Sequence, residues 1–466
     1  MMRERFGQGI TMAPHRADID RAAIPIFFAL VTAALMVAAL CGGPLSWDGA
    51  FYLFVTLDRQ IPFFTRARAI NAVLETPVLA VSHFSNNFTI LRAVFCICYA
   101  SVPGLGLALS WIACRSSRPS LFIWPALSIS LAMLPGQFCF NSEAFMAASF
   151  TWPVFLAGLI GADRGLLPVL ALLEVMVWFA HPIAVALSAF AALATAVSAS
   201  RLSGRARFRR YAGAFLLAVL ALSRVLAGFS SYEHHMMSPR SVIASFRWSV
   251  LGWPLASLAF VSAAALRCLR SSATDRPTDE GDSAADYLLA GAVLAAGMCL
   301  IPWSLVPRAW AESIGYRFWV GPVSIALMAG CALDAWRSSP APSWTARKPA
   351  LVAIGSAFFI VLSLQSATWA RLKNRFVDDI HQAGSGCVPR SSFKWMTYTP
   401  LNHWATAAYS IVLQGRTPQV LVLDDDNCDT YMKNREVNII WFSRASGRGW
   451  FDLDHAGAQT GSAVRR

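Results

Sequence analysis

The stretch SWDGAFYL, Ser46–Leu53, follows directly on an apolar segment that begins at Ala22 and ends at Leu40. A transmembrane helix needs about 20 apolar residues, so this segment can cross a bilayer and Asp48 lies just outside the hydrocarbon, beside aromatic residues suited to the interface. A carboxylate that is dry on one side and wet on the other can act as a base or metal ligand toward a lipid-borne substrate. The alternative is a solvated aspartate that caps the next helix.

The composition of the chain is that of a membrane protein. Its 466 residues are 56% hydrophobic and only 14% charged, with a mean hydropathy of +0.49, which is more apolar surface than a soluble globule needs. The net charge of +13 raises the question of nucleic acid. The basic residues, however, fall in short loops between apolar segments, which is a topology signal. We therefore expect a protein surrounded by membrane lipids, with no nucleic-acid partner.

Apolar segments bounded by charges or by Pro and Gly predict an all-α polytopic fold with about 11 transmembrane helices. Residues 166–199 are nearly continuously apolar and could form one long span. A break at His181-Pro182 is favoured, because a single crossing would move the five arginines between Arg201 and Arg210 to the outside. The predicted spans lie near 22–41, 88–114, 120–138, 143–161, 166–180, 183–199, 211–229, 248–266, 287–302, 318–336 and 350–368.

The distribution of Lys and Arg predicts the orientation. One set of flanks carries eighteen of these residues and the opposite set seven, so the positive-inside rule places residues 1–21 in the cytoplasm. Residues 22–368 then form the membrane core, and 369–466 form an extracytoplasmic part. The expected location is the cell inner (plasma) membrane, crossed several times.

Two extracytoplasmic regions are expected to fold. The loop 42–87 is too long for a turn, and its mixed apolar and polar residues predict one or two short helices along the membrane surface. In the C-terminal part, strand-like runs at Ala408–Gln414 and Gln419–Leu423 predict a small α/β domain. Its only cysteines, Cys387 and Cys428, favour a disulfide over free thiols in an oxidising compartment.

Several ionisable side chains fall at the predicted outer ends of the spans, where they can converge on one site. Glu143 opens a span. It is either a second carboxylate opposite Asp48, for a metal or an acceptor hydroxyl, or a carboxylate that complements the dipole of its helix. Glu174 and His181 lie on one helical face that leads outward from the membrane, which fits a polar groove or an ion pair between Glu174 and Arg224. The complete set is Asp48, Glu143, His181, Glu233, Arg308 and Arg317.

Three short motifs carry a resemblance to a known family. They are WDGAFY at Trp47–Tyr52, NSE at Asn141–Glu143 and GYRFWVGP at Gly315–Pro322. Together with the predicted topology over residues 1–368, they resemble the GT-C superfamily of membrane glycosyltransferases, which use polyprenyl-phosphate-linked sugars. The extracytoplasmic part at 369–466 matches no family domain.

The resemblance implies a reaction and a set of roles. A sugar would pass from a polyprenyl-phosphate donor to an extracytoplasmic lipid or glycan acceptor by a single inverting displacement. Asp48 and Glu143 would be catalytic, and Arg317 with Arg308 would bind the donor phosphate. A divalent metal ion is left open, because Gly49 stands where many relatives carry a second acidic residue. The acceptor or cavity residues would be Tyr52, His181, Glu174 and Glu233.

Two other functions fit the sequence. A membrane transporter or lipid flippase would use Glu174, Arg224 and His181 to line a translocation path, although the internal repeats typical of transporters are not evident. A non-catalytic assembly protein would use the extracytoplasmic part to recruit a partner, and its outer cavity would lack clustered ionisable groups.

Overall fold

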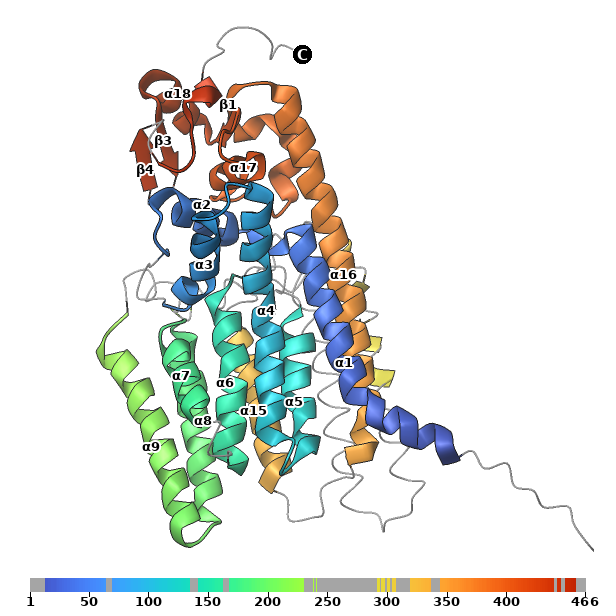
Figure 1. The fold of residues 1–466 in the computed structure, drawn as a ribbon. Helices are drawn as coiled ribbons and strands as arrows, with labels where there is room; N and C mark the ends of the chain where they lie inside the picture. The colour runs from blue at the N-terminus through green and yellow to red at the C-terminus, as the bar shows by residue number, and fades with distance from the viewer. Residues whose placement is uncertain are drawn as a thin grey trace, which may run out of the picture.

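The structure is a computed structural model, and most of the chain is described in it. Short pieces between 238 and 306 are also described. Within these residues the fold is mostly helical, with two small sheets near the C-terminus. Figure 1 shows a bundle of long helices below and the C-terminal part above it. The described ranges are 13–63, 69–134, 141–161, 167–229, 319–336, 344–439, 442–445 and 449–457.

In the described ranges, the bundle contains eight longer helices and one irregular stretch. The irregular stretch is a 3-10 turn (Pro119–Phe122), the short helix α5 (Ile123–Pro125) and a π-helical segment (Ala126–Ala132). The longer helices are α1 (Ala13–Cys41), α4 (Phe88–Cys114), α6 (Glu143–Ile160), α7 (Leu167–Trp178), α8 (Ile183–Ser200), α9 (Gly204–Leu226), α15 (Val320–Trp336) and α16 (Trp344–Ala383).

Five helices in the described ranges are long and apolar enough to cross a membrane, which marks the chain as a membrane protein. Shorter apolar helices coincide with three further predicted spans, and α9 covers most of another. The expected break at His181-Pro182 is present, because α7 ends at Trp178 and α8 begins at Ile183. The predicted span 248–266 and half of the predicted span 287–302 lie outside the described residues, so the total of about 11 stays a prediction.

Helix α16 joins the bundle to the C-terminal part. It lies beside α1 (Figure 1), and two of its side chains satisfy backbone carbonyls at the end of α1. Lys373 Nζ donates to the carbonyl of Cys41 at 2.9 Å, and Trp369 Nε1 donates to that of Gly42 at 3.1 Å. A cation at this end also complements the helix dipole. The boundary predicted at 368/369 therefore falls inside a continuous helix.

Arginines from the predicted cytoplasmic flanks gather at the opposite end of the bundle. Arg118 and Arg201 donate to the carbonyls of Ala335 and Trp336, the last residues of α15, at 2.6 and 2.7 Å. Arg347 pairs with Asp334 at 2.7 Å, and both side chains are buried. Basic side chains thus satisfy the carbonyl end of α15, which lies away from the C-terminal part in Figure 1.

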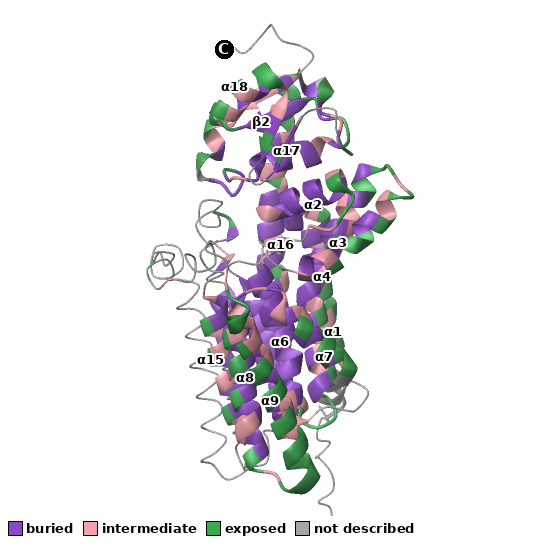
Figure 2. Ribbon diagram, turned by 90° about the vertical axis from the view of Figure 1, so that its left-hand side faces the viewer, coloured by how far each residue is buried: buried purple, intermediate pink, exposed green. Residues whose placement is uncertain are grey.

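The loop 42–87 contains the two short helices expected from its sequence. They are α2 (Asp48–Arg59) and α3 (Ala69–Ser82), and both lie between the bundle and the C-terminal part in Figures 1 and 2. Residues Gly49 to Leu57 of α2 are all buried, as the purple ribbon in Figure 2 shows. The middle of α2 is therefore enclosed by protein on every side, while Arg59 at its end is exposed.

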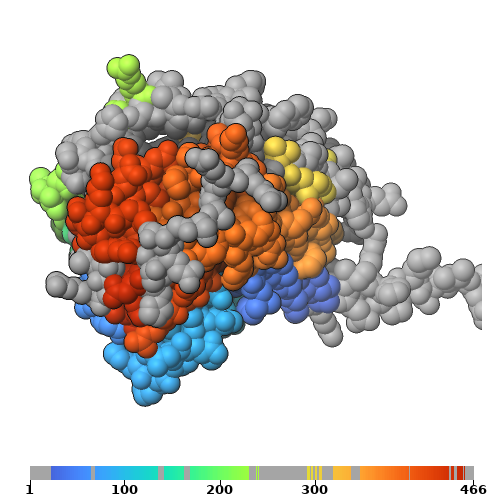
Figure 3. Space-filling model, turned by 90° about the horizontal axis from the view of Figure 1, so that it is seen from above, coloured from blue at the N-terminus to red at the C-terminus, as the bar shows by residue number. Residues whose placement is uncertain are grey.

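The C-terminal part is a small α/β unit. Strand β1 (Gly386–Pro389) pairs in parallel with β2 (Val420–Leu423), with Cys387 opposite Leu421. Strands β3 (Glu436–Ile439) and β4 (Phe442–Ala445) form an antiparallel pair. Helices α17 (Thr406–Gln414) and α18 (Asp425–Asn434) complete the unit. Seen from above, it forms the top surface of the molecule (Figure 3, orange to red).

One strand prediction is confirmed and the other is wrong. Gln419–Leu423 contains β2, but Ala408–Gln414 belongs to α17. Short apolar runs do not distinguish strand from helix by pattern alone, and this one begins with helix-favouring alanine. In the structure, α17 packs against both α2 and β2. Burial on these two sides favours the helical conformation of this segment.

Aromatic contacts and one ion pair fasten the C-terminal part to α2. Phe54 stacks on Phe451 at 5.2 Å between ring centroids and meets Phe442 edge-on at 5.4 Å. Asp58, one turn further on, forms a buried ion pair with Arg444 of β4. The contact is thus apolar along most of α2 and charged at its end.

Cys387 and Cys428 form a disulfide that joins β1 to α18, which is the pairing that the sequence favoured. The two residues are 41 apart in the chain. Closing a loop of this length stabilises a fold by about 3–4 kcal/mol in the chain-entropy account.

We expect Cys387→Ser and Cys428→Ser to lower the stability of the C-terminal part by that amount, about 3–4 kcal/mol. The double variant should be no less stable than either single variant, because both substitutions remove the same bond. Urea-dependent proteolysis of the full-length protein under non-reducing conditions measures this. Additive losses in the double variant would show that the two residues act separately.

Candidate functional site

Helix α2 carries a polar stripe on the side turned toward the bundle. Asp48, Tyr52 and Thr56 are spaced by four residues, which places them on one helical face. Tyr52 and Thr56 are buried and hydrogen-bond to two glutamates from other elements. This stripe forms one side of the candidate site.

Glu143 is the first of these glutamates. It is the first residue of α6, where the expected complement to the helix dipole applies, and only 4% of it is exposed. Its Oε1 accepts hydrogen bonds from Tyr52 Oη at 2.9 Å and from Asn71 Nδ2 at 3.0 Å. The structure therefore brings together Tyr52 and Glu143, two residues that the sequence analysis assigned to one site.

Glu75, on α3, is the second and is completely buried. Its Oε2 accepts from Thr56 Oγ1 at 2.8 Å and from the backbone N–H of Phe63 at 2.6 Å. Its Oε1 lies 3.0 Å from Tyr99 Oη, which is also 3.4 Å from Asn71 Oδ1. We call these six side chains the carboxylate cluster: Tyr52, Thr56, Asn71, Glu75, Tyr99 and Glu143.

Burial controls the protonation of the carboxylate cluster. It raises the pKa of Glu75 from its ordinary 4.5 to about 8, and the nearby charge of Glu143 adds to the increase. Glu75 therefore holds a proton near neutral pH. Tyr99 Oη lies within donating distance of Glu75 Oε1 and of Asn71 Oδ1, and the Asn71 amide donates to Glu143. Asn71 and Tyr99 therefore connect the two glutamates.

Asp48 lies where two of the sequence motifs meet. With its amide oxygen facing α2, Asn141 accepts hydrogen bonds from the backbone N–H groups of Asp48 and Gly49, at 3.3 and 2.9 Å. Asn141 therefore caps the N-terminus of α2, and the interpretation of Asp48 as the cap is wrong. The segments Trp47–Tyr52 and Asn141–Glu143, about ninety residues apart in the chain, form one contact.

Gly49 is required by the close approach of the chain to itself. A Cβ atom at this position would lie 1.8 Å from the carbonyl oxygen of Pro44, so no other residue fits this backbone. A second carboxylate at this position is thus sterically excluded. In the described part of the chain, no group of three or more His, Cys, Asp or Glu residues is arranged to hold a metal ion.

The other predicted site residues of the bundle have contacts of their own. Glu174 is buried and its Oε1 accepts from Ser188 Oγ at 2.6 Å, across the α7–α8 pair. Arg224 donates to the carbonyl of Gly228 at 2.9 Å and its guanidinium lies over the ring of Trp178. His181 Nδ1 accepts from the backbone N–H of Ile183 at 3.2 Å, in the turn between α7 and α8.

Three predicted site residues lie outside the described residues. They are Glu233 and the two proposed phosphate ligands, Arg308 and Arg317. The expectation that Asp48 and Arg317 face one cavity therefore stays a prediction.

Sequence reasoning missed four of the six side chains of the carboxylate cluster. Thr56, Asn71, Glu75 and Tyr99 were not singled out, because α2 and α3 looked like surface helices of mixed polarity and α4 like a plain span. A signal was present: Asn71 and Glu75 are four residues apart in an otherwise apolar helix, the same spacing as Tyr52 and Thr56. Two such pairs on neighbouring helices indicate a buried polar contact.

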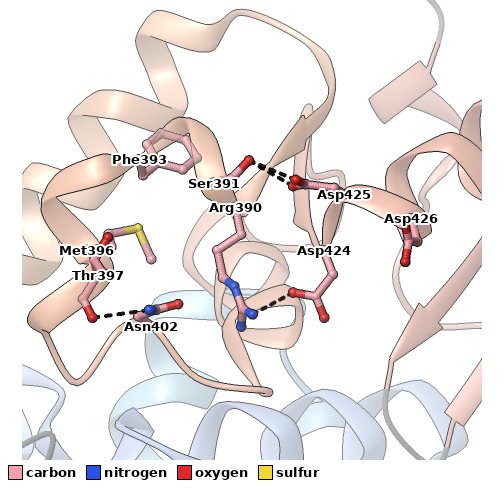
Figure 4. Close-up of a pocket in the computed structure, with 9 residues that line it drawn as sticks. All are labelled: Arg390, Ser391, Phe393, Met396, Thr397, Asn402, Asp424, Asp425 and Asp426. Carbon is pink, nitrogen blue, oxygen red and sulfur yellow. Dashed lines mark hydrogen bonds and ion pairs between the residues drawn. The ribbon is translucent and has the colours of Figure 1, made fainter.

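A cleft lies in the C-terminal part and is drawn in Figure 4. Its volume is about 470 Å³, and it opens where the parallel strands β1 and β2 end. Arg390, just after β1, pairs with Asp424, just after β2, at 2.8 Å, and Ser391 donates to Asp425 at 2.9 Å. The lining can hold a polar ligand. Arg390 also donates to the carbonyl of His403 at 2.7 Å, which links the cleft to the surface packed on α2.

We expect the pH dependence of stability to reveal Glu75. Because the pKa of Glu75 is raised, the folded state binds more protons than the unfolded state between about pH 4.5 and 8. The stabilisation that Glu75 contributes is therefore fully present below this window and is lost as pH rises through it. Glu75→Gln should lose less stability across that range. Glu436→Gln, a partly exposed glutamate of β3, is the matched control and should follow the native protein.

Thermal unfolding in detergent at several pH values measures this prediction. Infrared spectroscopy gives a direct check, because a protonated Glu75 contributes a carboxylic-acid carbonyl band that Glu75→Gln lacks. Identical pH profiles for Glu75→Gln and the native protein would contradict the assignment of the proton to Glu75.

No family model matches this chain, and comparisons with curated proteins and with solved structures give no significant match either. The function is therefore inferred from the residues of the chain and from their contacts, chiefly the carboxylate cluster and the junction of Asp48 with Asn141.

Proposed function

We propose that this protein is a membrane glycosyltransferase that moves a sugar from a polyprenyl-phosphate donor to an extracytoplasmic lipid or glycan acceptor. The observation that carries the proposal is the junction of Trp47–Tyr52 with Asn141–Glu143 at the top of the bundle. These are two of the three motifs that resemble the GT-C superfamily. Their contact supports one site built from both.

The proposed chemistry needs a base beside the membrane. Asp48 begins α2, directly after the apolar helix α1 and the tight turn at Gly43–Leu45, so its carboxylate is held at one depth. It accepts the proton of the acceptor hydroxyl while that oxygen attacks the anomeric carbon. The bond from that carbon to the donor phosphate breaks at the same time, and its electron pair leaves with the phosphate. The result is inversion in a single displacement.

The carboxylate cluster supports this base by fixing its surroundings. Tyr52, four residues after Asp48, is tied to Glu143, and Asn141 holds the first turn of α2. A base that is held in one orientation accelerates a displacement because the reacting groups need not be ordered again in each turnover. In the proposal, Arg317 and Arg308 bind the donor phosphate and offset its developing charge.

A transporter or flippase is favoured less by the described contacts. That function would need Glu174, Arg224 and His181 to face a common path. Glu174 is instead engaged by Ser188, and Arg224 lies over Trp178 and Phe229. These contacts are those of helix packing within α7, α8 and α9.

We expect Asp48→Asn to lower transfer by at least about 100-fold, the usual contribution of a general base, while membrane insertion is unchanged. Asp378→Asn, an exposed aspartate of α16, removes the same charge and should keep full activity. The measurement uses purified protein in nanodiscs with radiolabelled polyprenyl-phosphate hexoses and pentoses, and membrane extract supplies the acceptors.

The readout is release of polyprenyl phosphate and label in the acceptor fraction. Transfer by Asp48→Asn at the native rate would remove Asp48 from the role of base. Donor that crosses the bilayer of proteoliposomes without losing its sugar would favour the flippase over the transferase.

A further inference from the structure

The residue before Asp48 has an unusual backbone conformation. Trp47 has φ of 55° and ψ of −124°, a region that residues with side chains rarely adopt. Such a conformation costs free energy and persists only where the surrounding structure enforces it. Because Asp48 is the next residue, the direction of its carboxylate depends on how Trp47 is held.

The C-terminal part supplies the group that holds Trp47. The indole ring stacks on the imidazole of His403, with 4.8 Å between ring centroids and 26° between the planes. His403 is itself fixed, because its Nδ1 accepts from the backbone N–H of Ala405 at 3.0 Å and its carbonyl accepts from Arg390. Only 6% of His403 is exposed.

The imidazole acts here as a neutral ring. Burial lowers the pKa of His403 to about 3, and the charge of Arg390 adds to the effect. With Nδ1 used as an acceptor, the ring proton is on Nε2. A neutral planar ring with no freedom to rotate is a suitable surface for an indole.

We infer that His403 is a positioning residue, whose ring holds Trp47 in its strained conformation and thereby fixes the direction of Asp48. The C-terminal part then completes the site from above, while the carboxylate cluster fixes it from below. The consequence for catalysis rests on the proposed transferase function. The positioning itself does not.

Spacing along α2 supports this inference. Trp47, Phe51, Phe54 and Asp58 recur at helical intervals on the face turned to the C-terminal part, and each has a partner there. The other three contacts dock the C-terminal part. Only the contact of Trp47 acts on a residue whose backbone is strained and adjacent to the proposed base.

The test uses hydrogen–deuterium exchange of the full-length protein in nanodiscs. His403→Ala removes the stacking surface and should speed exchange of the amides of Asp48 and Gly49, which Asn141 otherwise protects. His403→Phe keeps a planar ring and should exchange like the native protein. Phe451→Ala is the matched control, because it removes a ring from the same interface opposite Phe54, two turns away from Trp47.

Three results would overturn the inference. The first is unchanged exchange at 46–51 in His403→Ala, or in a variant Trp47→Ala. The second is equal acceleration at 46–51 by Phe451→Ala, which would mean that the whole C-terminal part undocks. The third is failure of His403→Phe to restore slow exchange, which would exclude stacking as the cause.

Measurement of the rate of sugar transfer distinguishes a failure of this inference from a failure of the proposed function. If the native protein transfers sugar, His403→Ala should lower kcat roughly ten- to hundredfold with little change in KM, and His403→Phe should restore it, because misplacement of a reacting group affects the chemical step. If exchange changes as expected but the native protein transfers no sugar, the proposed function fails and the positioning role stands.

Discussion

Two buried carboxylates and the neutral groups around them determine how the upper half of this protein is assembled. Glu75 and Glu143 come from α3 and α6, and their partners Tyr52, Thr56 and Tyr99 come from α2 and α4. A buried carboxylate without partners is very unfavourable, so each of these elements must be in place before the others are stable there. Protonation of Glu75 lowers the cost further, because this side chain is then buried without a charge. A polar contact therefore fixes the relative positions of four helices in an otherwise apolar protein.

Helix α2 transmits this constraint to the C-terminal part because its two faces differ. The polar stripe of Asp48, Tyr52 and Thr56 faces the bundle, while Phe51 and Phe54 face the C-terminal part. Asp48 lies at the start of the stripe and at the start of the helix. Its position is thus set from below by Asn141 and from above through Trp47. The proposed base depends on both halves of the molecule, although it follows directly on the first apolar helix in sequence.

Helix α16 makes the same connection on the other side of the molecule. It passes from the bundle into the C-terminal part without a break and satisfies the last carbonyls of α1 with Lys373 and Trp369. The C-terminal part is therefore held by a continuous helix, by the aromatic face of α2 and by the Asp58–Arg444 ion pair. Three separate attachments limit its rotation, which the stacking of His403 on Trp47 requires.

The sequence by itself determined which segments are apolar helices, where α7 and α8 separate, that the loop 42–87 carries short helices, and that Cys387 pairs with Cys428. These features follow from local hydropathy, from helix-breaking residues and from the presence of only two cysteines in the polar C-terminal part. They therefore need no knowledge of contacts between distant residues. The tertiary structure decided that Ala408–Gln414 is helical, that Asn141 caps α2, and that Glu75 is buried rather than exposed on a surface helix. Each of these depends on contacts between residues far apart in the chain, and no local pattern records which distant group will satisfy a carboxylate, an amide or an apolar face.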